Sequence, residues 1–354
     1  MRRNTLTEIA RLAGVSSSTV SRALNPRTAH LIGRERREKI IALCNQLNYR
    51  PKNAARSCAT GKSYSIGYIS GRLAIDMDSP FFSNCIACLC RELQKNGYSL
   101  MMISAEPGAD DYQSSVRDIL LSDRADGYII GSALLEKQTL EMFCNTGHPI
   151  VTTSRDQHFG AENISVVELD TRAAYTQIWQ SMPQELLKQK FCFAGTHTES
   201  SYVKFDIIQK TAPSGAAVEL LPPIPQMRYF ELNYPNARRY FEELDNLLQY
   251  KVFWCASDLI AGALCDVLRS RGAVPGVDVM VIGYDNLTAV IPDFQESLAT
   301  IDPGWSEMGK YVAELILKQV EKKEPSPEIL KINARAVPGK SFPFFKNNHA
   351  ITEI

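Results

Sequence analysis

Basic side chains that could bind an anion are concentrated in the first 62 positions of the sequence. This stretch holds 13 Lys and Arg side chains against three Glu, a net charge of +10, within a 354-residue chain that is neutral overall. The remaining residues therefore carry a net charge of −10. Because Lys and Arg neutralise phosphates, this distribution predicts a small module that binds a polyanion, joined to a larger folded body.

A second set of polar and aromatic side chains follows apolar runs later in the chain. Asp258 follows the run VFWC and Asp285 follows VIGY, positions that a parallel sheet gathers at its carboxyl edge. Carboxylates and aromatic rings suit a polyhydroxylated ligand, because a carboxylate accepts from two hydroxyls while a ring covers the apolar face of a sugar. For each residue the alternative is a helix cap or a loop carboxylate. The candidate ligand-binding residues are Asp76, Phe81, Phe82, Arg155, Asp258 and Asp285.

The elements that position the basic residues are short helices. Thr5 and Glu8 form a capping box, so a helix begins at about residue 6 and ends at Gly14, where glycine favours a left-handed turn. Ser16 can cap a second helix that runs to about residue 24. A third helix is expected from about residue 34 to 47, with apolar residues on one face. Two short helices joined by a glycine turn predict a helix-turn-helix.

The elements that position the ligand-binding residues alternate between apolar strands and amphipathic helices. Strands are expected at 65–69, 99–103, 127–130 and 150–153, with helices between them at 82–96, 112–121 and 136–144. A second set of elements spans 172–187, 190–194, 199–211, 217–221, 236–248, 252–255, 258–271 and 279–283, followed by a helix at 305–320. The alternation predicts two parallel, doubly wound sheets. With 45% hydrophobic residues, the composition excludes disorder throughout and a fibrous chain.

The strings LTEIARLAGVSSSTVSRAL, LNYRPKNAARS and YSIGYIS resemble the LacI/GalR family of bacterial transcription regulators. The resemblance covers nearly the whole chain and is strongest over residues 5–70. It implies an all-α helix-turn-helix headpiece and an α/β bilobed body similar to periplasmic binding proteins. The implied domains are a DNA-binding headpiece (1–49), a hinge helix and linker (50–62) and an effector-binding and dimerisation domain (63–354). Within the last, the first lobe spans about 63–162 and 302–325, and the second about 163–300 and 326–342.

The resemblance also implies which residues contact DNA. The second helix of the motif lies in the major groove in this family, so Ser17, Ser18 and Arg22 fall where bases are read. An Arg can pair with a guanine edge in two places, whereas the alternative for Arg22 is a solvated helix face. Phosphate binding or helix capping is expected of Thr5, Ser16, Thr19 and Ser21. The candidate DNA-binding residues are Thr5, Ser16, Ser17, Ser18, Thr19, Ser21, Arg22, Asn25, Tyr49, Asn53, Arg56 and Cys58.

The chain departs from the family pattern in two places. Cys58 stands where the family usually places a leucine that wedges into the minor groove, so either the DNA kink is shallower or the operator centre differs. In the second lobe, Val203 and Asp206 align with an Arg and a Gly of the family, with Lys204 beside them. The effector is therefore atypical, or the pocket is empty and the protein binds DNA constitutively.

The expected assembly is a homodimer on a pseudo-palindromic double-stranded DNA operator, with a small-molecule effector such as a sugar. After Phe345 only KNNHAITEI remains, which has no leucine heptads for a tetramer helix. The sequence contains no phosphate loop, GxSxG motif or HExxH motif, so it gives no sign of an enzyme. The cysteines of the CxxCxC run, Cys85, Cys88 and Cys90, are expected to be inert thiols in the core. We therefore expect no cofactor and no metal. A free small-molecule-binding protein is a less favoured alternative, since it would not need the basic module.

The expected location is the bacterial cytoplasm, with association with the nucleoid when bound to DNA. No run approaches the roughly 18 apolar residues that span a bilayer. The amino-terminal string MRRNTLTEIARLAG has no hydrophobic signal core.

Overall fold

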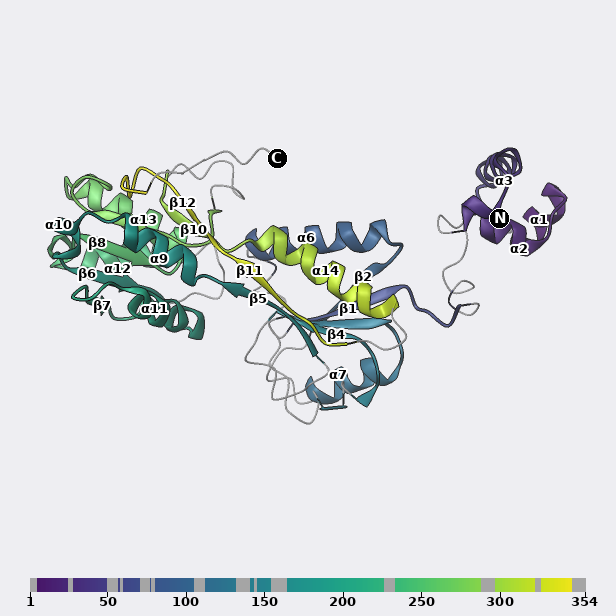
Figure 1. Cartoon of the computed structure of the whole chain (residues 1–354), viewed down its shortest axis with the longest axis horizontal. Coiled ribbons are helices and arrows are strands. Elements are labelled where there is room, and N and C mark those ends of the chain that lie inside the picture. The colour runs from purple at the N-terminus through teal and green to yellow at the C-terminus, as the bar shows by residue number, and fades with distance from the viewer. Residues whose placement is uncertain are drawn as a thin grey trace. The chain divides into compact units, whose positions relative to one another are not determined.

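The structure is a computed structural model that describes residues 5–24, 28–49, 57, 60–70, 77, 80–104, 112–131, 141–142, 145–153, 164–225, 233–287, 297–321 and 326–345. The chain forms two compact units, Met1–Tyr64 and Ser65–Ile354. Figure 1 colours the smaller unit purple and the larger one from blue to yellow.

The smaller unit is the predicted helix-turn-helix. Its helices are α1 (Leu6–Ala13), α2 (Ser17–Leu24) and α3 (Arg34–Gln46), with a short 3-10 helix η1 (Ala29–Leu31) between the last two. The predicted capping box is present, because the amide of Thr5 donates to Glu8 Oε2 at 2.6 Å and the amide of Glu8 donates to Thr5 Oγ1 at 3.3 Å. Gly14 ends α1 with a φ of 66°, a conformation that a Cβ disfavours. Ile9, Val20 and Ile40, one from each helix, are buried together in the core.

The larger unit begins with a parallel six-stranded sheet of order β11-β5-β4-β3-β1-β2. Its strands are β1 (Ser65–Ser70), β2 (Ser99–Ser104), β3 (Gly127–Ile130), β4 (Ile150–Thr152), β5 (Ile164–Asp170) and β11 (Ile329–Asn333). Helices α6 (Pro80–Lys95) and α14 (Trp305–Glu321) pack against each other on one face, and α7 (Tyr112–Leu121) covers the other (Figure 1). Covering both faces explains why these strands are apolar along their length.

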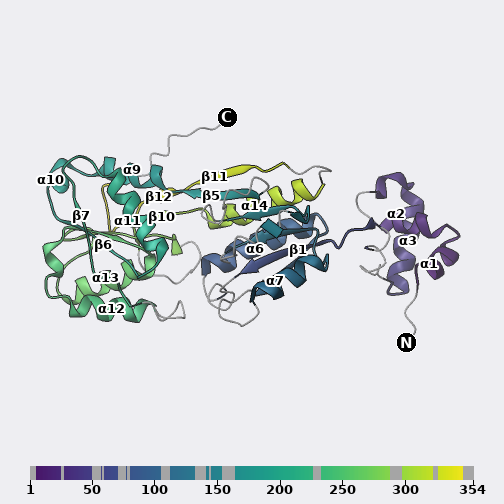
Figure 2. The ribbon, with the colours of Figure 1, turned by 90° about the horizontal axis from the view of Figure 1, so that it is seen from below.

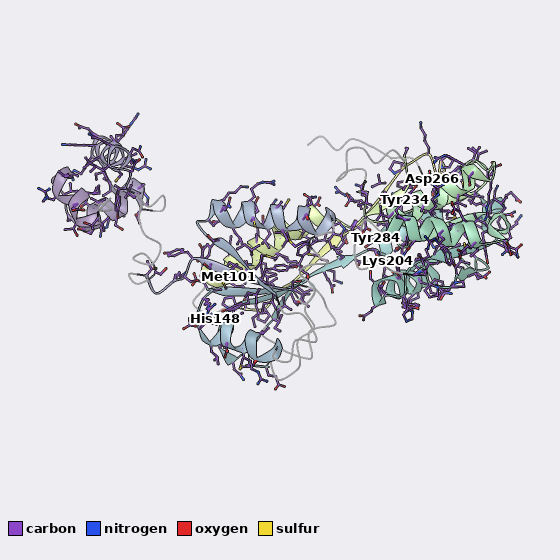
Figure 3. All side chains as sticks on the ribbon, turned by 180° about the vertical axis from the view of Figure 1, so that it is seen from behind. Met101, His148, Lys204, Tyr234, Asp266 and Tyr284 are labelled. Carbon is purple, nitrogen blue, oxygen red and sulfur yellow. The ribbon has the colours of Figure 1, made fainter. Side chains whose placement is uncertain are left out.

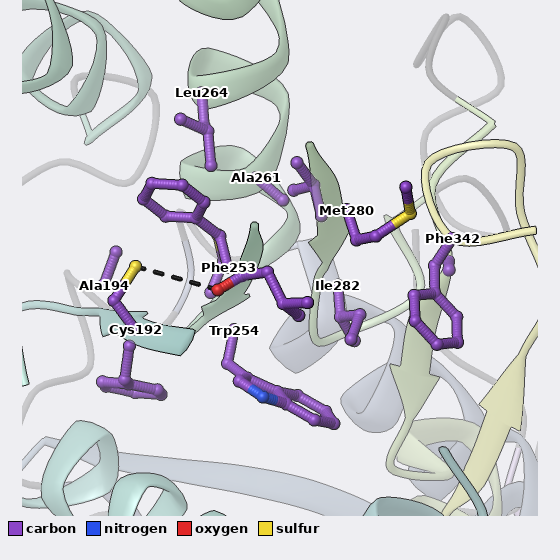
Figure 4. Packing of buried hydrophobic residues seen from close by; sticks show 14 of the residues in the cluster. Cys192, Ala194, Phe253, Trp254, Ala261, Leu264, Met280, Ile282 and Phe342 are labelled. Carbon is purple, nitrogen blue, oxygen red and sulfur yellow. Dashed lines mark hydrogen bonds between the residues drawn. The ribbon is translucent and has the colours of Figure 1, made fainter. Parts of the chain in front are cut away.

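A second parallel sheet has four strands in the order β7-β6-β8-β9. The strands are β6 (Phe191–Ala194), β7 (Val218–Leu220), β8 (Val252–Cys255) and β9 (Met280–Ile282). Around them lie α9 (Arg172–Ser181), α10 (Gln184–Leu187), α11 (Glu199–Thr211), α12 (Asn233–Glu243), the 3-10 helix η4 (Leu247–Gln249) and α13 (Asp258–Ser270), which Figure 2 shows from a second direction. Phe253, Trp254 and Met280 lie in the core of this lobe, where Cys192 Sγ also contacts the carbonyl oxygen of Val252 at 3.9 Å (Figure 4).

Three segments join the two sheets, and two of them differ from the sequence-based prediction. The chain was expected to leave the first lobe near residue 163, but β5 pairs with β4 and the chain leaves only after Asp170. Residues 326–342 were expected in the second lobe, but β11 pairs with β5 in the first sheet. Only β12 (Arg335–Val337) turns away, to pair antiparallel with β10 (Thr300–Asp302). β5 and β11 lie together at one edge of the first sheet. The sheet to which each strand belongs is therefore set by its pairing in the tertiary structure.

One predicted helix is divided. Residues 172–187 were expected to be continuous, but α9 ends at Ser181 and α10 begins at Gln184, with Pro183 between them. Proline lacks the amide hydrogen that a helix interior requires, so the break occurs there.

Candidate functional site

The first candidate surface is the outward side of α2 in the headpiece. Ser16 caps this helix as predicted, because the amide of Thr19 donates to Ser16 Oγ at 3.2 Å. The Ser16 hydroxyl also lies 2.8 Å from Ser18 Oγ and 2.9 Å from Thr19 Oγ1. Ser18, Ser21 and Arg22 are exposed, whereas Ser17 and Thr19 are half-buried. Hydroxyls at the positive end of a helix are well placed to meet a phosphate.

Arg22 lies in the last turn of α2 and is exposed. Its carbonyl oxygen accepts from Thr28 Oγ1 at 3.1 Å, which ties the end of α2 to the segment before η1. Within the described part of the chain, its guanidinium has no carboxylate partner.

Tyr49 occupies a different environment from the other candidate DNA-binding residues. Its side chain is 8% exposed and belongs to the headpiece core, and its amide donates to the carbonyl oxygen of Cys44 at 2.8 Å. Burial, followed by the nearby Cys44, raises the pKa of its hydroxyl. The ring thus supports the fold, while a contact of the hydroxyl with DNA stays a prediction. The candidates outside the described residues are Asn25, Asn53, Arg56 and Cys58.

The second candidate site lies at the carboxyl edge of the second sheet, where Asp258 begins α13. Its side chain is 0% exposed. Its Oδ1 accepts from Thr300 Oγ1 at 2.6 Å, and its Oδ2 accepts from the amide of Leu287 at 2.8 Å. A Cβ at Gly283 would lie 2.0 Å from Asp258 Oδ1, so only glycine leaves room for the carboxylate. Both oxygens of Asp258 are therefore engaged inside the protein.

Burial raises the pKa of Asp258 to about 8, against the hydrogen bonds from Thr300 and Leu287, which lower it. The loss of water around a carboxylate disfavours its charged form. Its participation in effector binding stays a prediction, and in this geometry it would act by shaping the loop after β9.

Asp285, the next candidate, follows β9 in an unusual backbone conformation. Its φ is 103°, a region that L-residues rarely adopt, and its amide donates to the carbonyl oxygen of Ile301 at 2.9 Å. The side chain is 6% exposed. Burial raises its pKa to about 6, while the Lys204 ammonium and the Trp305 indole favour the ionised form.

Lys204, on α11, is a site residue that sequence reasoning did not single out as a candidate. Its Nζ donates to the carbonyl oxygen of Ala256 at 2.8 Å and lies 3.7 Å from the centroid of the Tyr284 ring (Figure 3). Burial lowers its pKa, and the carboxylates of Asp285 and Asp258 oppose that shift. These contacts place a half-buried cation at this edge.

The two positions aligned with the family's Arg and Gly do not face this cluster. Val203 is 48% exposed, and Asp206 pairs with Lys210 on the same helix at 2.7 Å. The sequence offered one signal for Lys204: it is a basic residue next to Val203, the position that aligns with the family's Arg. Helix rotation, which decides which of two neighbours points inward, could be known only from packing.

A small hollow lies between β6, α11 and the end of β7. Its volume is about 20 Å³, which holds one water molecule. It is lined by Phe193, Gly195, Thr196, Ser201, Tyr202, Leu220, Leu221 and Pro223. At its rim His197 Nδ1 and the Tyr202 hydroxyl lie 2.6 Å apart.

In the first lobe the structure describes one candidate side chain, Phe82. Its ring meets Tyr68 of β1 edge to face, with ring centroids 5.8 Å apart. A Cβ at Gly131 would lie 2.1 Å from the Tyr68 hydroxyl, so that hydroxyl reaches the carboxyl end of β3. Phe82 and Tyr68 thus place aromatic surface at the carboxyl edge of the first sheet. Asp76, Arg155 and the side chain of Phe81 lie outside the described residues.

The cysteine run on α6 does not form a metal site in the part of the chain that the structure describes. Cys85, Cys88 and Cys90 are partly buried and reduced. Burial, followed by the neighbouring Cys88, raises the pKa of Cys85 to about 12. No group of three or more metal-ligating side chains occurs among the described residues. Among the residues that the structure describes, no helix is long and apolar enough to span a membrane.

Two family models match the chain. "Bacterial regulatory proteins, lacI family" covers residues 5–52, and "Periplasmic binding proteins and sugar binding domain of LacI family" covers residues 69–346. The chain belongs to the LacI family. Its helix-turn-helix falls within the first match, and both of its parallel sheets fall almost wholly within the second. Members of this family are DNA-binding transcription regulators with an effector-binding domain.

Several LacI-family proteins are similar to this chain over most of their length. The sucrose operon repressor of Pediococcus pentosaceus is 27% identical, with 89% of this chain and 92% of the relative covered. The repressor PurR of Actinobacillus pleuropneumoniae is 24% identical, with 94% and 96% covered. Among solved structures, the lac repressor dimer bound to operator and the anti-inducer ONPF superposes with a TM-score of 0.68 at 20% identity, covering 96% of this chain and 100% of that one. That last likeness is evidence for the fold.

Proposed function

We propose that this LacI-family regulator is a repressor that binds a pseudo-palindromic DNA operator as a homodimer and responds to a small polar effector. The observation that carries the proposal is the outward face of α2, where Arg22 is exposed without a carboxylate partner in the described chain. Arg22 reads a guanine edge, because its guanidinium offers two parallel donors to the two acceptors that guanine presents in the major groove.

The rest of the headpiece positions α2 on the duplex. Ser16 and Thr19, at the start of α2, and Thr5, at the start of α1, bind backbone phosphates through hydroxyls or through the helix ends that they cap. Such contacts carry no base information. They set the register in which Arg22, Ser17 and Ser18 meet the bases.

The homodimer follows from the small reach of one headpiece. A single recognition helix reads few base pairs, whereas a two-fold pair doubles the contacts at a fixed half-site spacing. Sedimentation of the purified protein tests this assembly. A monomer on operator DNA, or a stable tetramer at micromolar concentration, would contradict it.

The effector is proposed to bind at the carboxyl edges of the two sheets. Of the proposed contacts, Asp258 and Asp285 of the second lobe and Phe82 of the first lie among the described residues, and Asp76, Arg155 and the side chain of Phe81 lie outside them. A carboxylate accepts from ligand hydroxyls while aromatic rings cover its apolar face. The proposed role is regulatory, with no catalytic step, metal or cofactor, and its place is the bacterial cytoplasm.

A second candidate function is a DNA-binding regulator with a degenerate, effector-independent pocket. The observation that favours it is the ammonium of Lys204, which lies 3.7 Å from the centroid of the Tyr284 ring, next in the chain to Asp285. A regulator of this kind would bind its operator equally with and without small molecules.

Two experiments separate these functions. Electrophoretic mobility on operator and random duplexes, with the full chain and with residues 63–354 alone, tests whether the headpiece carries DNA binding. A thermal-shift screen of sugars, polyols and nucleosides tests the effector. A hit that also changes operator affinity supports the effector-responsive repressor. Absence of any hit supports the degenerate pocket, and equal DNA binding by both forms of the chain would contradict both.

A further inference from the structure

The last turn of α2, which carries Arg22, is attached to the rest of the headpiece through its own carbonyl groups. The last carbonyls of a helix have no amide partner within the helix, so they need donors from elsewhere. The carbonyl oxygen of Arg22 accepts from Thr28 Oγ1 at 3.1 Å, and that of Ala23 accepts from Arg37 Nε at 3.2 Å. Side chains from outside α2 therefore supply donors to two adjacent carbonyls of its last turn.

Arg37 differs from the other basic side chains at the start of α3. It is half-buried, whereas Arg34, Arg36 and Lys39 are exposed. Its Nε–H is donated to α2, 14 positions earlier in the chain. The carbonyl end of a helix carries a partial negative charge, so the positive guanidinium favours this contact as well as the hydrogen bond. Arg37 thus links the start of α3 to the end of α2.

This link matters because α2 is short. The helix has eight residues, and an isolated helix of this length is marginal in water. Ala23 is 0% exposed and belongs to the headpiece core, whereas Arg22, its neighbour in the chain, is exposed. The core therefore does not hold the Arg22 side chain directly. Its position depends on how the last turn of α2 is fixed.

We propose that Arg37 and Thr28 are positioning residues for base readout, because they hold the last turn of α2 where the Arg22 guanidinium can reach a base edge. The inference rests on the proposed readout by Arg22 and adds the residues that fix its geometry. In this role neither Arg37 nor Thr28 touches DNA. A binding contact is most precise when the group that makes it is held by a second layer of hydrogen bonds.

Two other roles of Arg37 would give a different pattern of binding. An arginine that binds a phosphate strengthens binding to every duplex, since phosphates carry no sequence information. An arginine that only stabilises the headpiece also affects every duplex, because the folded fraction falls without it. A positioning residue instead changes the ratio of operator affinity to random-duplex affinity. That ratio is therefore the quantity to measure.

Two neutral variants of the full chain test the Nε–H donor. Arg37→Gln places an amide nitrogen the same number of bonds from the backbone as Arg37 Nε, whereas Arg37→Met has no donor. The probes are a duplex selected by the wild-type chain from a randomised pool and a scrambled duplex of equal length. We expect Arg37→Met to lower the affinity ratio about tenfold, within the range of coupled neighbours, and Arg37→Gln to keep most of it. An unchanged ratio in Arg37→Met, or equal losses in both variants, would overturn the proposal.

A double-mutant cycle with Arg22→Ala tests whether Arg37 acts through Arg22. Once Arg22 is removed, Arg37→Met should lower the affinity ratio no further, and additive losses would overturn the proposal. If Arg22→Ala alone leaves the ratio unchanged, the proposed base readout fails and this inference fails with it. A normal effect of Arg22→Ala beside an unchanged ratio in Arg37→Met would overturn this inference alone.

Thr28 provides a second pair of variants should Arg37→Met lose the circular dichroism of a folded headpiece. Thr28→Val removes the hydroxyl that donates to the carbonyl oxygen of Arg22, and Thr28→Ser keeps it. We expect Thr28→Val to lower the affinity ratio and to relax preference at the base pair that Arg22 reads, while Thr28→Ser stays near wild type. Equal ratios for the two variants would overturn the positioning role.

Discussion

The hydroxyl of Thr300 donates to Oδ1 of Asp258 at 2.6 Å, joining β10 to the first residue of α13. The amide of Leu287 donates to the other oxygen at 2.8 Å, so a single buried carboxylate ties together the helix, the loop after β9 and one connection between the sheets. Asp285 lies within that loop. These two hydrogen bonds to Asp258 therefore help to hold Asp285 at its unfavourable φ of 103°.

Replacing Thr300 with Val should destabilise the body, because the change removes the donor and leaves an acceptor oxygen of Asp258 unsatisfied in the interior. The expected loss is about 1 to 3 kcal/mol of unfolding free energy. Urea unfolding followed by tryptophan fluorescence measures it. Thr300→Ser, which keeps the hydroxyl but lacks the methyl group, is the control and should lose less; a Val variant as stable as wild type would show that the hydroxyl does not stabilise the fold through Asp258.

Gly283→Ala should also destabilise the body, since the new Cβ would lie 2.0 Å from Asp258 Oδ1 and must displace the carboxylate. The expected cost is about 1 to 3 kcal/mol, as for other overpacked sites. The same urea titration measures it. The control is Gly33→Ala, where a Cβ meets nothing within 4 Å. A body as stable as wild type in the Gly283 variant would mean that the carboxylate can move freely.

Stability should fall as pH rises from about 6 to 8 because of Asp258. Burial raises the pKa of its carboxyl to about 8 in the folded protein, against an ordinary value of 3.8. Between these two values the folded state holds a proton that the unfolded chain has released. The free energy of unfolding therefore decreases as pH rises, until the carboxyl of the folded protein has also ionised. Asp285, whose pKa is raised to about 6, adds the same sign at lower pH.

Asp258→Asn separates the contribution of this group. The variant cannot ionise, so its melting temperature should fall less between pH 6 and pH 8 than that of wild type, whatever its starting value. Differential scanning calorimetry in matched buffers gives both slopes. Parallel slopes would show that Asp258 does not titrate in this range.

Arg22→Ala should weaken operator binding by about 1 to 3 kcal/mol and relax base preference at one position in each half-site. Binding to random DNA should fall much less. Fluorescence anisotropy at fixed salt compares the two duplexes. The matched control is Arg34→Ala, an exposed arginine of α3 that already pairs with Glu38 at 2.9 Å. Equal losses on operator and random DNA would make Arg22 a phosphate contact.

Cys58→Leu should sharpen the operator bend and tighten specific binding, if residue 58 is the wedge that the family pattern implies. A larger apolar side chain unstacks a base step more fully, and the protein–DNA interactions that a sharper bend permits offset the free energy of unstacking. Circular-permutation assays on one operator compare wild type with Cys58→Leu and Cys58→Ser. Identical bends and affinities for all three would place the wedge elsewhere.

Local elements of this protein could be read from its sequence. The helices Tyr112–Leu121 and Glu199–Thr211 and the strands Gly127–Ile130 and Val252–Cys255 have the predicted bounds. The capping box of Thr5 was also predicted correctly. These features depend on hydrophobic periodicity and on hydrogen bonds between residues three or four positions apart, which one short segment specifies by itself.

Two features follow only from long-range packing: the lobe to which β5 and β11 belong, and the direction in which the Lys204 side chain points. β5 belongs to the first sheet only because it pairs with β4, and β11 only because it pairs with β5. Asp258 turned out to be engaged by Thr300, 42 positions away, and Lys204 by Ala256, 52 positions away. A carboxylate after a strand looks the same in sequence whether its partner is a ligand or a distant hydroxyl. Only the long-range packing that brings the donor within hydrogen-bond distance separates the two.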